Sequence, residues 1–185
     1  MSTDAVLSAC KSAMSKAMDH LESELLKIRT GKASPAMLDS VMVPYYGTPT
    51  PIQQVASVNT PDARTISVQP WEKNIIPDIE KAIIQANLGL NPQNDGEMIR
   101  VNVPPLTEER RKEMVKLAKA EGEHAKVSLR NARRDANEAV KKLQKEGLAE
   151  DLAKDAEAEI QQIIDSFTKK VDELCAIKEK EIMKV

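Results

Sequence analysis

Residues 115–143 read VKLAKAEGEHAKVSLRNARRDANEAVKKL, and this stretch decides the fold. Apolar or small residues recur in it at alternating steps of three and four, which places them on one face of an α-helix as a heptad seam. A helix of this kind cannot bury its apolar stripe alone, so the pattern predicts partner helices. The seam consists of Val115, Ala118, Gly122, Ala125, Leu129, Ala132, Ala136, Ala139 and Leu143.

Two further stretches have the same helical spacing. The first runs from Asp4 to Arg29, where Ser2 or Thr3 is a candidate N-cap, and the second follows Gly147. Thr107 is a candidate N-cap for the central helix, which is predicted to run about 40 residues, or roughly 60 Å. Three amphipathic helices with one seam each predict a three-helix bundle. The predicted flanking seams are Leu7, Cys10, Met14, Ala17, Leu21, Leu25 and Ile28, and Leu152, Ala156, Ile160, Ile163, Phe167, Val171, Leu174 and Ile177.

A segment of different composition lies between the first and second predicted helices. All ten prolines lie between Pro35 and Pro105, among short segments rich in Val, Ile, Tyr and Thr. These segments predict strands, and the spacing from Ile76 to Ala86 predicts one helix, which Gly89 would close. The string Tyr45 to Pro51 is interpreted as a strand end and a proline-fixed loop that packs two tyrosines. The predicted strands are Val41–Val43, Ile52–Val58, Thr65–Gln69 and Met98–Val103.

The sequence therefore predicts an α+β protein of two domains. Residues 1–30 plus 106–185 would form an elongated three-helix bundle, and residues 31–105 an inserted small β/α/β domain. Two neighbouring chain segments must then join the domains, which makes a hinge possible. The hinge candidates are Thr30, Gly31, Pro104 and Pro105: glycine frees the backbone, and proline stiffens it.

Composition excludes several classes of function. Aromatic residues are 2% of the chain and charged residues 30%, which suits long helices with narrow seams. No apolar run approaches the ~20 residues that span a bilayer, and the N-terminus has no pattern of a secretory or transit signal, so a monomeric cytoplasmic protein is expected. Cys10 and Cys175 form no CxxC pair, and His20 and His124 stand apart. Without a catalytic motif either, we expect no enzyme, cofactor or metal.

The charges are unevenly distributed between the second and third helices. Residues 106–148 hold 12 Lys/Arg against 8 Asp/Glu, whereas residues 149–185 hold 6 against 10. The cations of the second helix gather on one flank, roughly 110° from the seam: Lys119, Lys126, Arg130, Arg133, Arg134 and Lys141. Aligned guanidinium groups suit an RNA phosphate backbone. Two alternatives stay open: a solvated flank paired with the acidic third helix, and a protein-binding adaptor.

Five strings of this chain resemble the bacterial ribosome recycling factor family, in the order that the family has them. The resemblance extends over essentially the whole chain. The strings are residues 28–35 (IRTGKASP), 45–51 (YYGTPTP), 88–92 (LGLNP), 104–111 (PPLTEERR) and 130–137 (RNARRDAN).

The resemblance implies an L-shaped molecule, a three-helix bundle with a hinged β/α/β domain, and a non-enzymatic role in translation. After peptide release, the bundle would lie against large-subunit ribosomal RNA, and elongation factor G with GTP would drive the factor to split the ribosome. By the family's motifs, Arg130 and Arg133 would be the principal RNA contacts, with Arg134, Lys126 and Arg111 as further candidates. A general double-stranded RNA binder is a third possibility.

Overall fold

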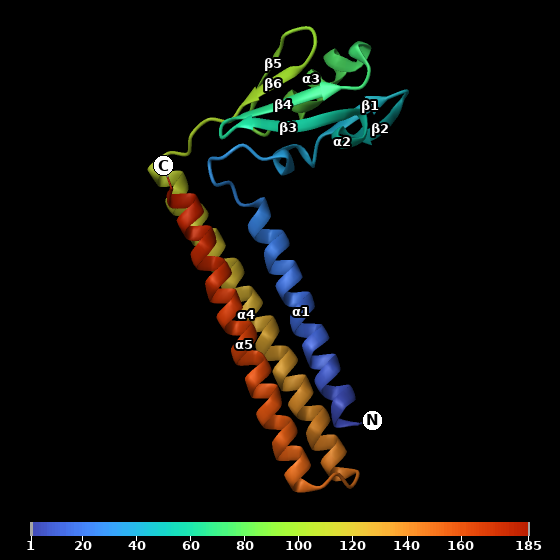
Figure 1. Ribbon diagram of the computed structural model, residues 1–185, viewed down its shortest axis with the longest axis vertical. Helices are drawn as coiled ribbons and strands as arrows, with labels where there is room; N and C mark the ends of the chain where they lie inside the picture. The colour runs from blue at the N-terminus through green and yellow to red at the C-terminus, as the bar shows by residue number, and fades with distance from the viewer. Residues whose placement is uncertain (1, 185) are drawn as a thin grey trace. The chain divides into compact units, whose positions relative to one another are not determined.

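A computed structural model of the chain describes residues 2–184, which divide into two compact units. The first unit comprises residues 2–28 and 111–184 and is helical; the second comprises residues 29–110 and holds every strand of the described chain (Figure 1). Long helices together with a small sheet-containing unit confirm the α+β class. Arg29, Thr30 and residues 106–110 belong to the second unit.

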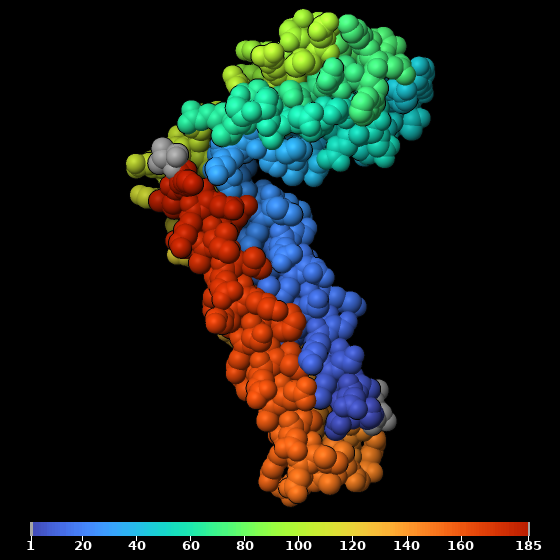
Figure 2. Space-filling model, in the orientation of Figure 1, coloured from blue at the N-terminus to red at the C-terminus, as the bar shows by residue number. Residues whose placement is uncertain are grey.

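Three long helices build the first unit: α1 (Thr3–Lys27), α4 (Glu108–Lys145) and α5 (Glu150–Met183). The caps that the sequence predicts are present, because Ser2 Oγ accepts from Ala5 N at 3.2 Å and Thr107 Oγ1 accepts from Arg110 N at 3.3 Å. With 38 residues, α4 has the predicted length. The closest backbone approach in the bundle joins α1 to α5, which lie side by side on the face that Figure 2 shows.

The bundle core follows the predicted seams with several shifts. In α4 the predicted positions from Ala118 to Leu143 are buried or half-buried, and Val140, which the heptad omitted, is fully buried. In α5 the predicted Leu152 and Ile177 are exposed, and Ala153, Ile164 and Ile182 are buried instead. A strict 3.5-residue repeat drifts against the 3.6 residues of a helical turn, so the error accumulates toward the ends of a long helix.

Leu129 lies at the centre of this core with 0% of its surface exposed, and it offers a test of the packing. We expect Leu129→Ala to lower the free energy of unfolding by about 3 kcal/mol, because it removes buried methyl groups and leaves a cavity. Leu117→Ala is the matched control: Leu117, on the same helix, is 50% exposed, and its truncation should cost under about 1 kcal/mol. Urea unfolding followed by circular dichroism measures both values. Equal losses would contradict the assigned core.

The second unit contains two antiparallel sheets and one full helix. Strands β1 (Met42–Tyr45) and β2 (Thr48–Pro51) form a hairpin, and the four-stranded sheet has the order β3-β4-β6-β5. Its strands are β3 (Ala56–Asp62), β4 (Thr65–Pro70), β5 (Asn91–Asn94) and β6 (Ile99–Asn102). Helix α3 (Ile76–Gln85) packs its buried isoleucines into the core of this unit. Short 3₁₀ turns at Pro35–Leu38 and Lys73–Ile75 complete it.

Some of the strand predictions for this unit were wrong. Residues Ile52–Val55 form a helical turn, α2, because Ile52 and Val55 are both buried at a spacing of three. Strand β5 was missed, since Asn91–Asn94 has no β-branched residue and is held only by its pairing with β6. Helix α3 ends one residue before the predicted Ala86, which is its C-cap, and left-handed residues follow at Asn87, with φ 51°, and at the predicted Gly89, with φ 69°.

The string Tyr45 to Pro51 is a hairpin rather than a loop. Tyr46 and Gly47 both take positive φ, 47° and 79°, as the two central residues of a tight hairpin turn do. Both tyrosine hydroxyls donate to the carboxylate of Glu72, at 2.8 Å and 3.3 Å. Tyr46 is nevertheless 80% exposed, so only Tyr45 packs against the core. The predicted packing is therefore confirmed for the ring of Tyr45 and wrong for the ring of Tyr46.

Candidate nucleic-acid interface

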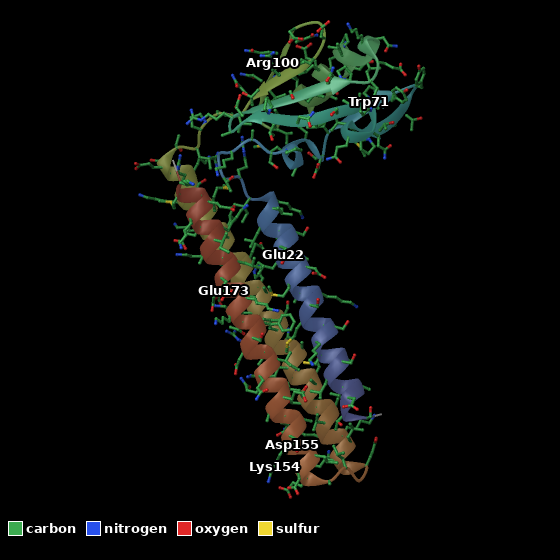
Figure 3. All side chains as sticks on the ribbon, in the orientation of Figure 1. Glu22, Trp71, Arg100, Lys154, Asp155 and Glu173 are labelled. Carbon is green, nitrogen blue, oxygen red and sulfur yellow. The ribbon has the colours of Figure 1, made fainter. Side chains whose placement is uncertain are left out.

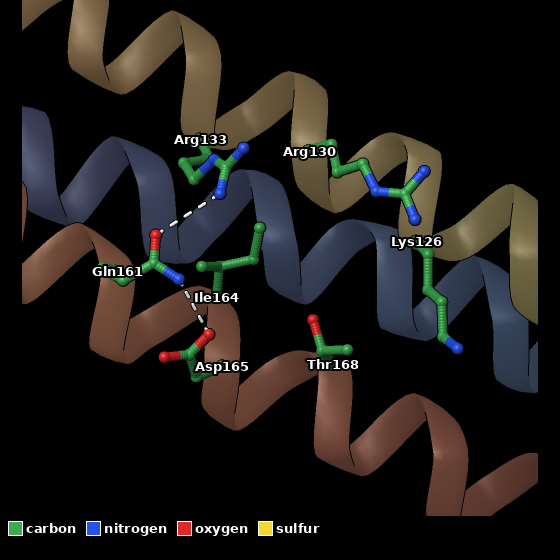
Figure 4. A pocket seen from close by; sticks show the side chains of 7 residues that line it. All are labelled: Lys126, Arg130, Arg133, Gln161, Ile164, Asp165 and Thr168. Carbon is green, nitrogen blue, oxygen red and sulfur yellow. Dashed lines mark hydrogen bonds between the residues drawn. The ribbon is translucent and has the colours of Figure 1, made fainter.

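A groove of about 180 Å³ lies between α4 and α5 in the middle of the bundle. Figure 4 shows side chains from both helices around it. Helix α4 contributes three of the predicted cations, and α5 contributes a buried isoleucine and three polar groups. The lining residues are Lys126, Arg130, Arg133, Gln161, Ile164, Asp165 and Thr168.

Two of the three lysines of the basic flank, Lys119 and Lys126, are paired with the acidic helix α5. Lys126 Nζ lies 2.7 Å from Asp172 and 3.5 Å from Glu123, and its side chain is only 23% exposed. The hydrogen bond to Asp172 raises the pKa of Lys126 above its usual value, so the pair stays charged. Lys119 Nζ lies 3.5 Å from Glu179. For these two residues the alternative of a flank neutralised by the third helix is correct.

The two central arginines are not neutralised in this way. Arg130 is exposed, and within residues 2–184 no ion pair or hydrogen bond engages its guanidinium group. Arg133 is half-buried, and its Nη1 donates to the neutral Oε1 of Gln161 at 3.3 Å. At the groove, the positive charge that α5 leaves uncompensated therefore lies on Arg130 and Arg133, about one helical turn apart.

The remaining predicted site residues do not line the groove. Arg134 is exposed, and its Nη2 lies 3.5 Å from Asp135 of the same helix. Arg111 Nη1 donates to the carbonyl oxygens of Ile182, Met183 and Lys184 at 3.5, 3.3 and 3.1 Å. These carbonyls have no partner within the helix, so Arg111 caps the C-terminal end of α5.

Sequence reasoning missed the contribution of α5 to this site. Gln161, Asp165 and Thr168 follow one another at steps of four and three, beside the buried Ile160 and Ile164. That spacing sets three polar side chains along the edge of the seam, facing the cations of α4. Polar residues at helical spacing beside the predicted seam of α5 are the pattern in the sequence that indicates this contribution. The net acidity of α5 does not indicate it.

The groove suits a polyanion better than it suits chemistry on a small substrate. Guanidinium groups offer forked, permanently charged donors, which match phosphate oxygens. His20 and His124 are surface residues near Glu24 and Glu121 of their own helices, and both cysteines are free thiols. Among residues 2–184 no cluster of three or more His, Cys, Asp or Glu could hold a metal ion. Over the same residues, every helix is too short or too polar to cross a membrane.

Comparisons with known proteins agree on one family. The sequence model described as ribosome recycling factor matches residues 21–183. The ribosome-recycling factor of Flavobacterium psychrophilum is 57% identical over 98% of this chain and 97% of its own length. The protein of the same name from Porphyromonas gingivalis is 59% identical over 93% of each chain.

Two solved structures resemble this chain. A solution structure of the ribosome recycling factor has a TM-score of 0.79 at 39% identity and covers 100% of this chain and 99% of its own. The T. thermophilus ribosome recycling factor, bound with E. coli elongation factor G to the E. coli post-termination complex, has a TM-score of 0.67 at 46% identity. The match covers 99% of this chain and 100% of that one.

Proposed function

Because this chain belongs to the ribosome recycling factor family, we propose that it splits the post-termination ribosome together with elongation factor G and GTP, releasing it from messenger RNA. The helical unit binds large-subunit ribosomal RNA, and the sheet-containing unit receives the force that elongation factor G delivers. The protein is a translation factor rather than an enzyme, and it works as a cytoplasmic monomer without a cofactor.

The observation that carries the RNA-binding role is the difference between Lys119 and Lys126, which are paired, and Arg130 and Arg133, which are not. Lys119 and Lys126 are paired with α5, whereas no carboxylate lies in ion-pair range of Arg130 or Arg133 within residues 2–184. If the flank only stabilised the bundle, ion pairs with α5 would be expected for all four of these cations. Two unpaired cations on a rigid helix keep their charge and their hydrogen-bond donors available to phosphate, because no ion pair has to be broken before they bind.

We assign Arg130 and Arg133 as the principal RNA contacts, with Lys126 and Arg134 beside them. Lys119 forms an ion pair with Glu179, and Arg111 donates hydrogen bonds to the end of α5. We therefore assign both residues a secondary role in RNA binding. Lys126 holds α4 against α5 through Asp172 and thereby keeps the arginines in line.

The mechanism also needs the two units to move, and we place the hinge at Thr30, Gly31, Pro104 and Pro105. Two hydrogen bonds of 2.8 Å anchor the connecting segments to the same β3–β4 turn: Ala33 N donates to Ala63 O, and Val103 N donates to Arg64 O. Thr30, Gly31, Pro104 and Pro105 lie on the helical-unit side of these anchored residues, where a change in φ and ψ would turn one unit without disturbing the β3–β4 anchor. Gly31 has φ 80°, a region that other residues rarely adopt.

Sedimentation of the purified protein with vacant 70S ribosomes across a salt series tests the proposed function. We expect the logarithm of the binding constant to fall with the logarithm of salt concentration with a slope of about −2, one unit for each phosphate that Arg130 and Arg133 neutralise. The protein should also split ribosomes only when elongation factor G and GTP are present. Magnesium concentration is held constant throughout.

The same experiment separates the alternatives. A protein-binding adaptor would show no affinity for ribosomes, or a slope near zero. A general double-stranded RNA binder would be displaced equally well by any RNA duplex added as competitor. Either result would overturn the proposed function.

A further inference from the structure

The groove between α4 and α5 contains an acid as well as the two arginines. Asp165 of α5 is exposed and faces the same groove as Arg130 and Arg133. Within residues 2–184 no cation lies in ion-pair range of its carboxylate, although Arg130, Arg133 and Lys126 line the same space. Opposite charges so placed on flexible side chains ordinarily pair. Here they stay separate, and both remain available to a ligand.

Gln161 explains how the charges are kept apart. Its Oε1 accepts from Arg133 Nη1 at 3.3 Å, and its Nε2 donates to Asp165 Oδ1 at 2.8 Å. The amide thus stands between the guanidinium and the carboxylate, as the dashed lines in Figure 4 show. It fixes the direction of both groups without neutralising either. One oxygen of Asp165 is used by Gln161, and the other is free to accept.

We propose that this groove binds one ribonucleotide of an RNA strand from two sides, with its phosphate against Arg130 and Arg133 and its 2′-hydroxyl donating to Asp165. The inference rests on the proposed function and adds to it a second, acceptor side of the site on α5. A bare phosphate backbone offers acceptors only, so a carboxylate beside it would repel it. A ribose hydroxyl is a donor next to the phosphate, and it is what distinguishes RNA from DNA.

The other lining groups fit the same ligand. Ile164, 5% exposed, closes the groove with an apolar surface, against which the ribose carbons can pack. Thr168 offers a hydroxyl that can both donate and accept. Lys126 points toward Asp172 and contributes positive potential rather than a free donor.

The substitution Asp165→Asn tests the proposal, because the two possible roles of the carboxylate predict opposite changes in affinity for ribosomes. Asparagine keeps one oxygen to accept from Gln161 and exchanges the other for a donor, so the fold and Arg133 stay in place. If the carboxylate accepts a ribose hydroxyl, affinity for vacant ribosomes should fall about tenfold, with an unchanged salt slope, because no phosphate contact is lost. If Asp165 only repels phosphate, the variant should bind more tightly. Tighter or unchanged binding overturns the proposal.

Asp155→Asn is the matched control, since it removes the same charge from an exposed position of α5 about 15 Å along the helix (Figure 3). It should bind like the unmodified chain. Binding of the unmodified chain to ribosomes reports on the proposed function itself, so the two failures are distinguishable.

A second measurement tests the chemical identity of the ligand. Acylation of ribose 2′-hydroxyls on large-subunit RNA should show a nucleotide that the unmodified protein protects and that Asp165→Asn leaves reactive at equal occupancy. Identical acylation patterns for the two proteins would overturn the ribose assignment.

Discussion

Replacing Arg133 with Glu is expected to weaken binding to vacant ribosomes by more than 100-fold, equivalent to about 2.7 kcal/mol. The substitution removes charge-assisted hydrogen bonds to phosphate, each worth about 1.5–3 kcal/mol, and places a carboxylate where a phosphate must lie. Arg133 is half-buried beside Gln161 rather than in the bundle core. The helical content and the unfolding midpoint should therefore stay close to those of the unmodified chain.

Lys142→Glu is the control for this experiment. Lys142 is an exposed residue of the same helix, and nine residues from Arg133 it lies about 180° around the helix axis. Its reversal changes the net charge by the same amount and should alter binding only a few-fold. Comparable losses in both variants would mean that the ribosome senses net charge alone, and the assignment of Arg133 as a specific contact would be wrong.

A disulfide between positions 31 and 106 is expected to preserve ribosome binding but to slow splitting by elongation factor G and GTP more than tenfold. Gly31 and Leu106 meet where the two connecting segments run together, since a Cβ on Gly31 would lie 3.6 Å from Leu106 Cγ and 3.7 Å from Leu106 N. In the variant Gly31→Cys/Leu106→Cys, only Ile28, Arg29, Thr30 and Thr107 remain between the cross-link and the helix ends. So few free dihedral angles leave little room for a hinge to open.

The reduced form of the double variant serves as its own control. It carries the same strain from a side chain at φ 80°, so only the cross-link differs when a reductant restores splitting. The native thiols interfere little, because burial raises the pKa of both Cys10 and Cys175 and lowers their reactivity. Normal splitting by the oxidised protein, measured by light scattering, would rule out a hinge at these residues.

The long helices could be predicted from the sequence because their information is local. The heptad from Val115 to Leu143, the cap at Thr107 and the break at Gly147 each depend on residues close together in the chain. Short strands such as β5 could not be predicted in the same way. Asn91–Asn94 has low strand propensity and is extended because β6 lies beside it, which is a property of the folded unit.

The candidate site also combines features that depend on local sequence with features that depend on the folded structure. The sequence by itself determined that α4 carries a flank of cations and that α5 is acidic, because helical period places residues on a face regardless of their partners. Only the tertiary structure decided which cations are neutralised. Lys126 meets Asp172, whereas Arg133 meets the neutral Gln161, and the two outcomes depend on how α4 and α5 are aligned along their lengths. That alignment is set by core packing between helices distant in sequence, so no local pattern could reveal it.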